Sequence, residues 1–439
     1  MPTSRPGQST ANGRASAERH TPVMQRREHR ATQRLAASMP TIDLVYFNAG
    51  GGHRAAALAL EAVIREQQRP WNVRCINLME VLDPRAQFFR FTGMAPEDLY
   101  NKRLPKGWTL GFAQELKLLQ GMIKLGHSML VQRLQQHWLR SAPDMVVSLI
   151  PNFNRALYES VVSVLPGVPC VTVLTDLADH PPNFWIEPGQ AQHLVCGSAR
   201  AVAQARAAGR DEEFVHASSG MIIRPDFYRP LALDRRAERA RLGLDPDRTT
   251  GLVMFGGQGS MAMLDIAKQL DDVQLILLCG HNLPLARKLG ALKSTAARSA
   301  IGFTPEVRRY LQLADFFVGK PGPGSLSEAV QQGLPIVTVR NAWTMPQERY
   351  NTEWVLQHGL GLVARSMRNI RPTVLALLEG LDTYKANVRR IDNQAVFEVP
   401  EILAGILDTR VRSSSPGHER FMPVSFALPS MAMSHRRAT

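Results

Sequence analysis

Residues 319–351 join a glycine-rich turn to the polar side chains that commonly hold phosphates and sugars. An apolar run at 314–318 predicts a buried strand, and the turn after it leads into a helix that should begin near Ser325. Free N–H groups and the positive end of the helix dipole would make this turn an anion site. Ser325 would cap the helix or donate a hydrogen bond to a phosphate.

Glu328 allows two interpretations at this position. It lies three residues after Ser325, the spacing at which a glutamate completes a capping box. Its carboxylate could instead accept hydrogen bonds from a ribose diol, as an acidic residue does in dinucleotide-binding folds. The spacing alone leaves both interpretations open.

A second strand, glycine turn and helix lie near the other end of the chain. The strand is expected at 42–47 and the helix at 54–67, with Gly51, Gly52 and then His53 between them. His53 could make a structural hydrogen bond at the helix N-terminus. It could also be a general base on a rigid turn, where the helix dipole would lower the pKa of the imidazole and keep it neutral.

The elements that position these residues form two blocks of alternating strands and helices. The first block spans 40–222 and the second 233–409, joined by a proline-containing linker at 223–232. This pattern predicts an α/β fold with two Rossmann-like domains that face a cleft. Asp176 ends a strand of the first block, and a third glycine loop follows the first strand of the second. That loop consists of Gly256, Gly257, Gln258 and Gly259.

The net charge of +14 is unevenly distributed along the chain. Residues 1–39 and 410–439 are basic tails that we expect to be disordered, although the first also superficially resembles an organellar transit peptide. Residues 85–140 carry nine basic against three acidic residues, interleaved with aromatic and aliphatic ones. This composition favours a surface that binds anionic membranes, while an ordinary amphipathic helix with a solvated basic face is the alternative.

Several classes of function find no support in the sequence. No apolar run is long enough for a transmembrane helix. Nucleic-acid recognition motifs are missing and aromatic residues make up only 7% of the chain, so we expect no nucleic-acid partner. The four cysteines are scattered without a CxxC pair, which is typical of buried, reduced thiols in a cytosolic protein.

Five motifs, in order over roughly residues 40–405, resemble those of a known family. They lie at 50–55 (GGGHRA), at 143–144, at 175–185, at 256–259 and at 322–351. The chain resembles the monogalactosyldiacylglycerol synthase-like glycosyltransferases of the GT-B fold, which are family 28-type relatives of the lipid II N-acetylglucosaminyltransferase. Gln258 replaces the glutamate of the family's GGGEG loop, and residues 340–345 depart from its usual pattern.

The resemblance implies an inverting transfer of a hexose from a UDP-sugar to a lipid hydroxyl, most simply that of diacylglycerol. The first domain would bind the acceptor and the membrane, and the second would bind the donor. UDP-sugar would be a co-substrate, and the family pattern implies neither a metal nor another cofactor. The enzyme would be cytoplasmic and peripheral on the inner face of the cytoplasmic membrane. A polyisoprenoid or soluble acceptor, or nucleotide-sugar binding without catalysis, are the alternatives.

The resemblance also implies roles for individual residues. His53 would be the base or would orient the acceptor, with Asp176 as the second candidate and Gly51 and Gly52 forming the acceptor loop. Glu328 would hold the ribose. The 256–259 loop and the helix N-terminus at Gly324 and Ser325 would stabilise the diphosphate. The sugar hydroxyls would be read by Gln347 and Glu348, supported by Asn351.

Overall fold

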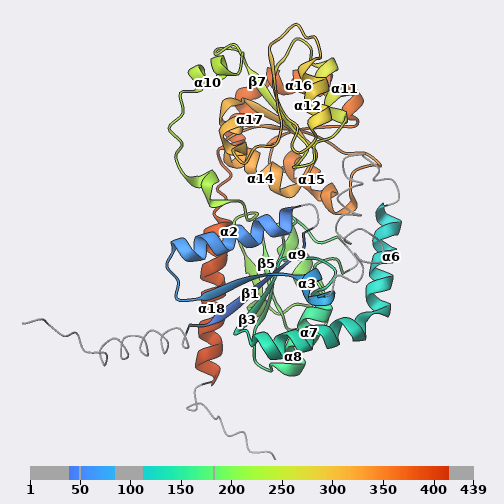
Figure 1. Ribbon diagram of the computed structural model, residues 1–439, viewed down its shortest axis with the longest axis vertical. Coiled ribbons are helices and arrows are strands. Elements are labelled where there is room, and N and C mark those ends of the chain that lie inside the picture. The colour runs from blue at the N-terminus through green and yellow to red at the C-terminus, as the bar shows by residue number, and fades with distance from the viewer. Residues whose placement is uncertain (1–38, 49–50, 85–111, 181–182, 415–439) are drawn as a thin grey trace, which may run out of the picture.

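Two parallel sheets of six strands each organise the computed structural model, which describes residues 39–48, 51–84, 112–180 and 183–414. The order is β2-β1-β3-β4-β5-β6 in the first sheet and β12-β11-β10-β7-β8-β9 in the second. Figure 1 shows the two domains stacked along the long axis of the molecule. The predicted fold class, two Rossmann-like α/β domains, is therefore confirmed.

The first sheet is built from short apolar strands that helices cover on both faces, as buried parallel strands require. Its strands are β1 (Thr41–Tyr46), β2 (Asn72–Asn77), β3 (Met145–Ser148), β4 (Cys170–Val173), β5 (His193–Cys196) and β6 (Val215–Ala217). Its helices are α2 (Gly52–Glu66), α3 (Leu78–Leu82), α6 (Phe112–Leu125), α7 (His127–Ser141), α8 (Asn154–Val164), α9 (Ala199–Ala207) and the short η2 (Glu212–Phe214).

The second domain repeats this plan after the linker. Its strands are β7 (Thr250–Met254), β8 (Gln274–Leu278), β9 (Arg298–Ile301), β10 (Phe316–Gly319), β11 (Ile336–Val339) and β12 (Gly361–Ala364). Its helices are α10 (Arg235–Arg241), α11 (Ala262–Gln269), α12 (Leu283–Gly290), α13 (Val307–Leu313), α14 (Pro323–Gln331), α15 (Arg349–Gln357), α16 (Arg371–Glu379) and α17 (Leu381–Val388). Three short helices, η3 (Pro225–Tyr228), η4 (Pro346–Glu348) and η5 (Met367–Asn369), lie in the linker and in loops.

The last helix, α18 (Ala395–Ser414), crosses back to the first domain. Figure 1 shows it running alongside that domain, where Val396, Val399 and Leu403 are fully buried in the same core cluster as Leu60 of α2. The sequence prediction, which assigned all of 233–409 to the second domain and a tail to 410–439, therefore needs correction. An amphipathic pattern predicts a helix, but it does not say which sheet the helix covers. The rest of both predicted tails, 1–38 and 415–439, lies outside the described residues.

The linker is packed rather than free. Phe227 is buried in the core of the second domain, and Tyr228 makes an edge contact with Phe397 of α18 at 5.0 Å between ring centroids. Arg229 pairs with Glu66 of α2 at 2.8 Å. The chain thus crosses between the domains twice, and both crossings contact the first domain.

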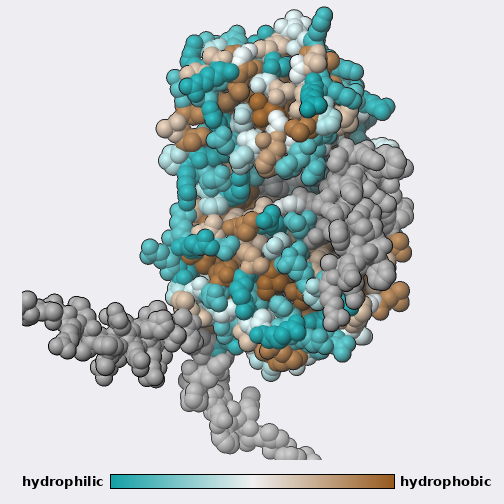
Figure 2. All heavy atoms as spheres, in the orientation of Figure 1, coloured by the Kyte–Doolittle hydropathy of each residue, from teal (hydrophilic) through white to brown (hydrophobic). Residues whose placement is uncertain are grey.

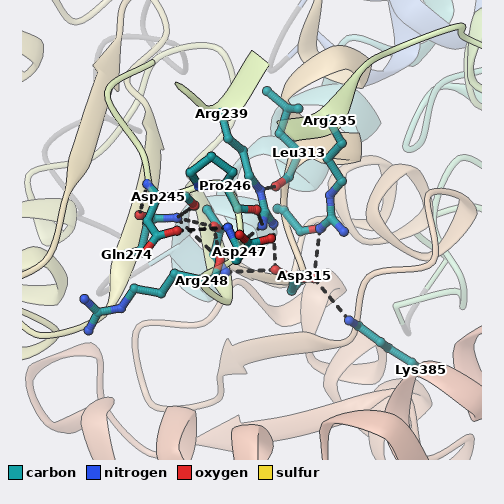
Figure 3. A network of polar contacts seen from close by, with 12 residues as sticks. Arg235, Arg239, Asp245, Pro246, Asp247, Arg248, Gln274, Leu313, Asp315 and Lys385 are labelled. Atoms are coloured by element: carbon teal, nitrogen blue, oxygen red, sulfur yellow. Dashed lines mark hydrogen bonds and ion pairs between the residues drawn. The ribbon is translucent and has the colours of Figure 1, made fainter. Parts of the chain in front are cut away.

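An ionic network fixes the start of strand β10 (Figure 3). The Asp315 carboxylate accepts hydrogen bonds from Arg235 at 2.8 Å, Arg239 at 2.7 Å, Lys385 at 3.2 Å and the Thr250 N–H at 2.9 Å. Burial alone would raise the pKa of Asp315, but the hydrogen bonds from Arg235 and Thr250 outweigh it and hold that pKa at about 2. The network ties α10 and α17 to the sheet, so the opposite end of β10 is presented in a fixed position.

Candidate functional site

Strand β1 and helix α2 place His53 at the carboxyl edge of the first sheet. Gly51 has a φ of +81°, a conformation that favours glycine, and α2 begins at Gly52 rather than near Arg54 as predicted. His53 is therefore in the first turn of the helix, with its Nδ1 2.9 Å from Thr175 Oγ1. Burial lowers the pKa of His53 to about 4, and a hydrogen bond to the Leu149 backbone opposes the shift. The imidazole is thus neutral chiefly because it is buried, and not because of the helix dipole on which the prediction relied.

Asp176 follows strand β4, and Trp185 contacts both Asp176 and His53. Asp176 Oδ2 accepts a hydrogen bond from Trp185 Nε1 at 2.9 Å, and the Trp185 ring lies 6.0 Å from the His53 ring between centroids. Asp176 is 7% exposed. Burial raises its pKa to about 7; the Trp185 hydrogen bond lowers that pKa, the Glu348 charge raises it and the Lys320 charge lowers it. Both first-domain candidates are therefore oriented by neighbours. The His53 ring is neutral near pH 7, and the Asp176 carboxyl ionises near that pH.

The second-domain anion site differs in detail from the prediction. Helix α14 begins at Pro323, with Gly322 as the N-cap residue and no side-chain cap, so Ser325 does not cap it. Proline is well suited to the first position of a helix because its fixed φ is helical and it needs no N–H partner there. Gly324 is exposed in the first turn, as an approaching anion would require. The capping-box interpretation of Glu328 therefore falls away.

Glu328 lies on α14, near Arg224 and Asp226 of the linker. Besides the larger effect of burial, the Arg224 charge lowers the pKa of Glu328, and the Asp226 charge raises it. Its carboxylate has no hydrogen-bond partner among the described residues, although the side chain is half-buried. Burial raises the pKa of Glu328 to about 7, and the Arg224 charge partly opposes this. A half-buried carboxylate without a donor is well suited to accept hydrogen bonds from a ligand.

The third glycine loop follows β7 directly. Gly256 and Gly259 have φ values of +70° and +61°, and a Cβ on Gly259 would lie 2.4 Å from the Cys279 carbonyl oxygen. The loop is thus shaped by glycine, while Gly257 and the side chain of Gln258 are exposed at its tip. The His281 N–H donates to the Gly257 carbonyl at 2.8 Å and anchors this loop to the end of β8.

The three residues predicted at the sugar site lie in or next to η4, close to the glycine turn before α14. Glu348, at the end of η4, is 5% exposed. The Asn351 amide donates to the Pro321 carbonyl at 2.7 Å, which ties α15 to the glycine turn. Gln347 is only partly buried, and its amide contacts Met345 Sδ at 3.7 Å.

Lys320, which no sequence pattern singled out, lies at the centre of this half of the site. Its Nζ is 2.9 Å from Glu348 Oε1, and its Cε is 4.0 Å from where a Cβ on Gly256 would be. A single lysine inside a glycine turn carries little signal. Its position directly after a buried strand was the available clue, because ligands bind at that edge of open α/β sheets.

An exposed aromatic platform was also missed. Phe303, just after β9, is 57% exposed and stacks on His281 with ring centroids 4.0 Å apart and an interplanar angle of 16°. The stack adjoins the third glycine loop through His281. Flat aromatic faces of this kind can pack against a nucleobase.

The residues of the site therefore fall into two groups that face each other between the domains. His53 and Asp176 lie on the first domain, and Lys320 and Glu348 lie on the second, close enough for their charges to act on Asp176. Figure 1 shows α14 and α15 on the side of the second domain that faces the first. A cavity of about 220 Å³ between the domains adjoins this site, lined by Leu177 and Ser198 on one side and Ser327 and Tyr350 on the other.

Within the described residues, His, Cys, Asp and Glu side chains form no group of three or more that could hold a metal ion. In the same part of the chain, every helix is too short or too polar to cross a bilayer.

Several known proteins are similar to this chain in sequence. No profile of a known protein family matches the chain. A probable monogalactosyldiacylglycerol synthase 2 of Oryza sativa subsp. japonica, chloroplastic, is 25% identical over 402 residues, covering 83% of this chain and 80% of the relative. Monogalactosyldiacylglycerol synthase 1 of Arabidopsis thaliana, also chloroplastic, is 24% identical over 343 residues, covering 74% of this chain and 62% of the relative.

Solved structures share the two-domain architecture. S. aureus MnaA bound to UDP superposes with a TM-score of 0.56 at 16% identity, covering 84% of this chain and 97% of that one. The glycosyltransferase VinC in complex with dTDP gives 0.52 at 15% identity, covering 84% and 100%. MurG of Acinetobacter baumannii gives 0.50 at 10% identity, covering 84% and 99%. The chain thus has the two-domain fold of these GT-B glycosyltransferases and is similar in sequence to the monogalactosyldiacylglycerol synthases.

Proposed function

We propose that this protein transfers a hexose from a UDP-sugar to the hydroxyl of a lipid, most simply diacylglycerol, with inversion at the anomeric carbon. The observation that carries the proposal is the opposition of two unlike half-sites. The first domain offers a proton acceptor in His53 or Asp176, and the second offers Lys320, two glycine turns and the unpartnered carboxylate of Glu328.

The donor would lie along the carboxyl edge of the second sheet. Its base would stack on Phe303, its ribose diol would donate hydrogen bonds to Glu328, and its diphosphate would meet the N–H groups of the 256–259 loop and of the first turn of α14. The hexose would then reach Gln347 and Glu348. These N–H donors and the α14 dipole can stabilise the leaving diphosphate, so we expect EDTA to leave the rate unchanged.

In the chemical step, the acceptor oxygen attacks the anomeric carbon while the bond to the diphosphate breaks. The acceptor proton passes to His53, whose ring is neutral near pH 7, and Asp176 is the alternative acceptor. Because the proton acceptor and the diphosphate site lie on opposite domains, the hydroxyl would approach from the face opposite the leaving group. Attack from that face inverts the configuration.

A donor and acceptor matrix tests the reaction. UDP-galactose, UDP-glucose and UDP-N-acetylglucosamine would each be offered with diacylglycerol, a polyisoprenyl phosphate and soluble alcohols, with products identified by mass spectrometry and their anomeric configuration by NMR. We expect a β-hexosyl diacylglycerol from one of the two UDP-hexoses. UDP-sugar binding without transfer to any acceptor would favour a non-catalytic role. Transfer to the polyisoprenyl phosphate instead of diacylglycerol would show that the acceptor is a polyisoprenoid.

Helix α6 supports a membrane location for the acceptor site. One side of it, through Leu116, packs on the cluster that contains Trp185, while Leu118, Met122 and Leu125 are 65%, 55% and 91% exposed. Lys117 and Lys124 are exposed on the same helix. Figure 2 shows hydrophobic surface at the right-hand edge of the first domain, where α6 lies in Figure 1. Apolar side chains flanked by lysines are typical of helices that lie in the interface of anionic bilayers.

We therefore propose a peripheral protein on the inner face of the cytoplasmic membrane. Substituting Leu118 and Leu125 by Gln, with Lys117→Gln and Lys124→Gln, should abolish sedimentation with vesicles rich in anionic lipid. It should also remove any stimulation of the rate by those vesicles. The matched control is Leu375→Gln with Lys268→Gln on the second domain, where both side chains are exposed. Equal vesicle binding by the two variants would reject the α6 surface. The rest of the predicted basic region, 85–111, lies outside the described residues.

A further inference from the structure

A cavity larger than the one between the domains lies at the opposite edge of the first sheet. Its volume is about 660 Å³, and it is lined by the starts of β4 and β5, by α8 and by the last turns of α18. Cys170 and His193 of this lining are the first residues of their strands, whereas Asp176 follows the end of β4. Figure 1 shows α8 and the C-terminal end of α18 at the end of the first domain that points away from the second. The cavity is therefore separate from the candidate site, and its volume is within the range of about 300–1,000 Å³ that is common for small-molecule sites.

One side of this cavity is aliphatic. Ile402 and Ile406 lie one turn apart on α18, and Val162 of α8 and Val168 before β4 line the same space. Val162 is 43% exposed and Val168 only 8%, so the aliphatic lining includes both surface and buried side chains. A ligand that removed this surface from water would be bound by the hydrophobic effect.

Gly405 keeps the α18 side of the cavity open. It lies in the interior of the helix, where glycine is less favourable than leucine or alanine. A Cβ at this position would meet no other atom within 4 Å, so packing within the protein does not require glycine here. A larger side chain would therefore occupy the free space beside the helix and leave the helix itself intact.

The polar side of the cavity offers little to an anion. Arg410 donates to the Asp144 carbonyl at 2.6 Å and pairs with the carboxylate of the same residue at 3.4 Å. His193 Nδ1 lies 3.0 Å from His216 Nε2, and burial lowers the pKa of both rings, that of His193 to about 4. Both rings are therefore neutral near pH 7, while Glu213 places an exposed carboxylate in the lining. A carboxylate or phosphate head group would be repelled there.

Tyr158 of α8 supplies a hydrogen-bonding group in the same lining. Its half-buried hydroxyl makes no hydrogen bond within the part of the chain that the structure describes. A phenol hydroxyl both donates and accepts, so it suits an uncharged hydroxyl of a ligand. The cavity thus combines an aliphatic wall with an uncharged polar partner.

We propose that this cavity binds a neutral single-chain lipid of the monoacylglycerol type. The acyl chain would lie between α8 and α18, and a head-group hydroxyl would meet Tyr158. The site is separate from the donor and acceptor sites, so the inference does not depend on the proposed transfer. Chains of the same length that carry a carboxylate or a phosphate should bind more weakly, because Glu213 opposes them.

Calorimetry on the full-length protein tests this site. Monodecanoylglycerol, sodium decanoate and decyl phosphate would each be titrated below the concentration at which they form micelles. The wild type should bind monodecanoylglycerol about tenfold or more tightly than either anion, because a buried charge without a partner is costly. Gly405→Leu should weaken that binding by about tenfold or more, because the leucine fills the space of the chain. Gly290→Leu is the matched control, since Gly290 is an exposed helix glycine of the second domain with open space around it.

Two further variants locate the ligand, and urea unfolding should find Gly405→Leu at least as stable as the wild type. Tyr158→Phe should lower the affinity for monodecanoylglycerol by about fivefold, the scale of one neutral hydrogen bond. Leu118→Gln with Leu125→Gln on α6 should leave that affinity unchanged. If Gly405→Leu binds the lipid as tightly as the wild type, or if the α6 variant abolishes binding, the cavity is not the site. Equal or tighter binding of either anion would overturn the neutral class of ligand.

Discussion

The two halves of the site hold their polar groups in opposite ways. In the first domain, His53 and Asp176 are each engaged by a neighbour from the adjacent strand or loop, Thr175 and Trp185 respectively. In the second domain, Lys320 pairs with Glu348 and Asn351 holds the glycine turn, but Glu328 has no hydrogen-bond partner in the described structure. Gly257 and Gly324 are exposed there, with open space around them. The first-domain groups are thus held in a defined orientation, whereas Glu328 and the glycine turns of the second domain are open to a ligand.

This contrast suggests a division of labour. Oriented groups with shifted pKa values suit proton transfer, because their geometry and pKa decide the rate. Open charges and free N–H groups suit binding, because a ligand supplies their missing partners. Substitutions in the two halves should therefore change different kinetic quantities, and the following experiments are ordered by the size of that change.

His53→Ala should produce the largest effect. Loss of the proton acceptor should lower kcat by about 10³-fold, within the range of general-base contributions, while UDP affinity stays within about twofold. His216→Ala is a matched control, because that residue lies on edge strand β6 and pairs with His193. The measurement is single-turnover transfer together with UDP calorimetry. If kcat of His53→Ala falls by less than about tenfold, Asp176 and not His53 is the base.

Glu328→Gln should produce a smaller effect, and on UDP affinity rather than on kcat. UDP affinity should fall by about tenfold, the scale of one charge-assisted hydrogen bond, and the preference for UDP over 2′-deoxy-UDP should shrink. Because the pKa of Glu328 is raised to about 7, the wild type should lose UDP affinity as pH falls below 7 and the carboxyl protonates. Glu328→Gln should show a flatter profile. An unchanged pH dependence in this variant would remove Glu328 from the donor site.

Asp176→Asn should act on a third quantity, the free energy of unfolding. A carboxyl whose pKa is raised in the folded state binds more protons folded than unfolded, so its ionisation costs stability as pH rises from about 4 through 7. The variant should be more stable than wild type at pH 8, on the order of 2 kcal/mol, and the gain should vanish near pH 4. Urea unfolding at the two pH values measures this, with Asp265→Asn on the surface as control.

Much of this architecture could be predicted from the sequence, for a physical reason. Apolar runs followed by glycines and then by helix-forming residues specify a strand, a turn and a helix locally, which is how the turns at Gly51, Gly256 and Gly322 were found. Glycine at a positive φ, as at Gly51 and Gly256, leaves a clear trace in the sequence.

The rest depended on contacts between distant segments. The return of α18 to the first domain, the Lys320–Glu348 pair and the Phe303–His281 stack each join residues whose partners no local pattern specifies. Strand β12 also went unpredicted, because its four residues follow Gly359 without a flanking turn motif.

The division of labour is tested most directly by single-turnover transfer at increasing UDP-hexose concentration, with His53→Ala and Glu328→Gln compared in the same assay. Glu328→Gln should approach the wild-type rate once the donor saturates, because only binding was weakened. His53→Ala should remain about 10³-fold slow at every donor concentration. If saturating donor fails to restore Glu328→Gln, or restores His53→Ala, the two half-sites do not have separate roles.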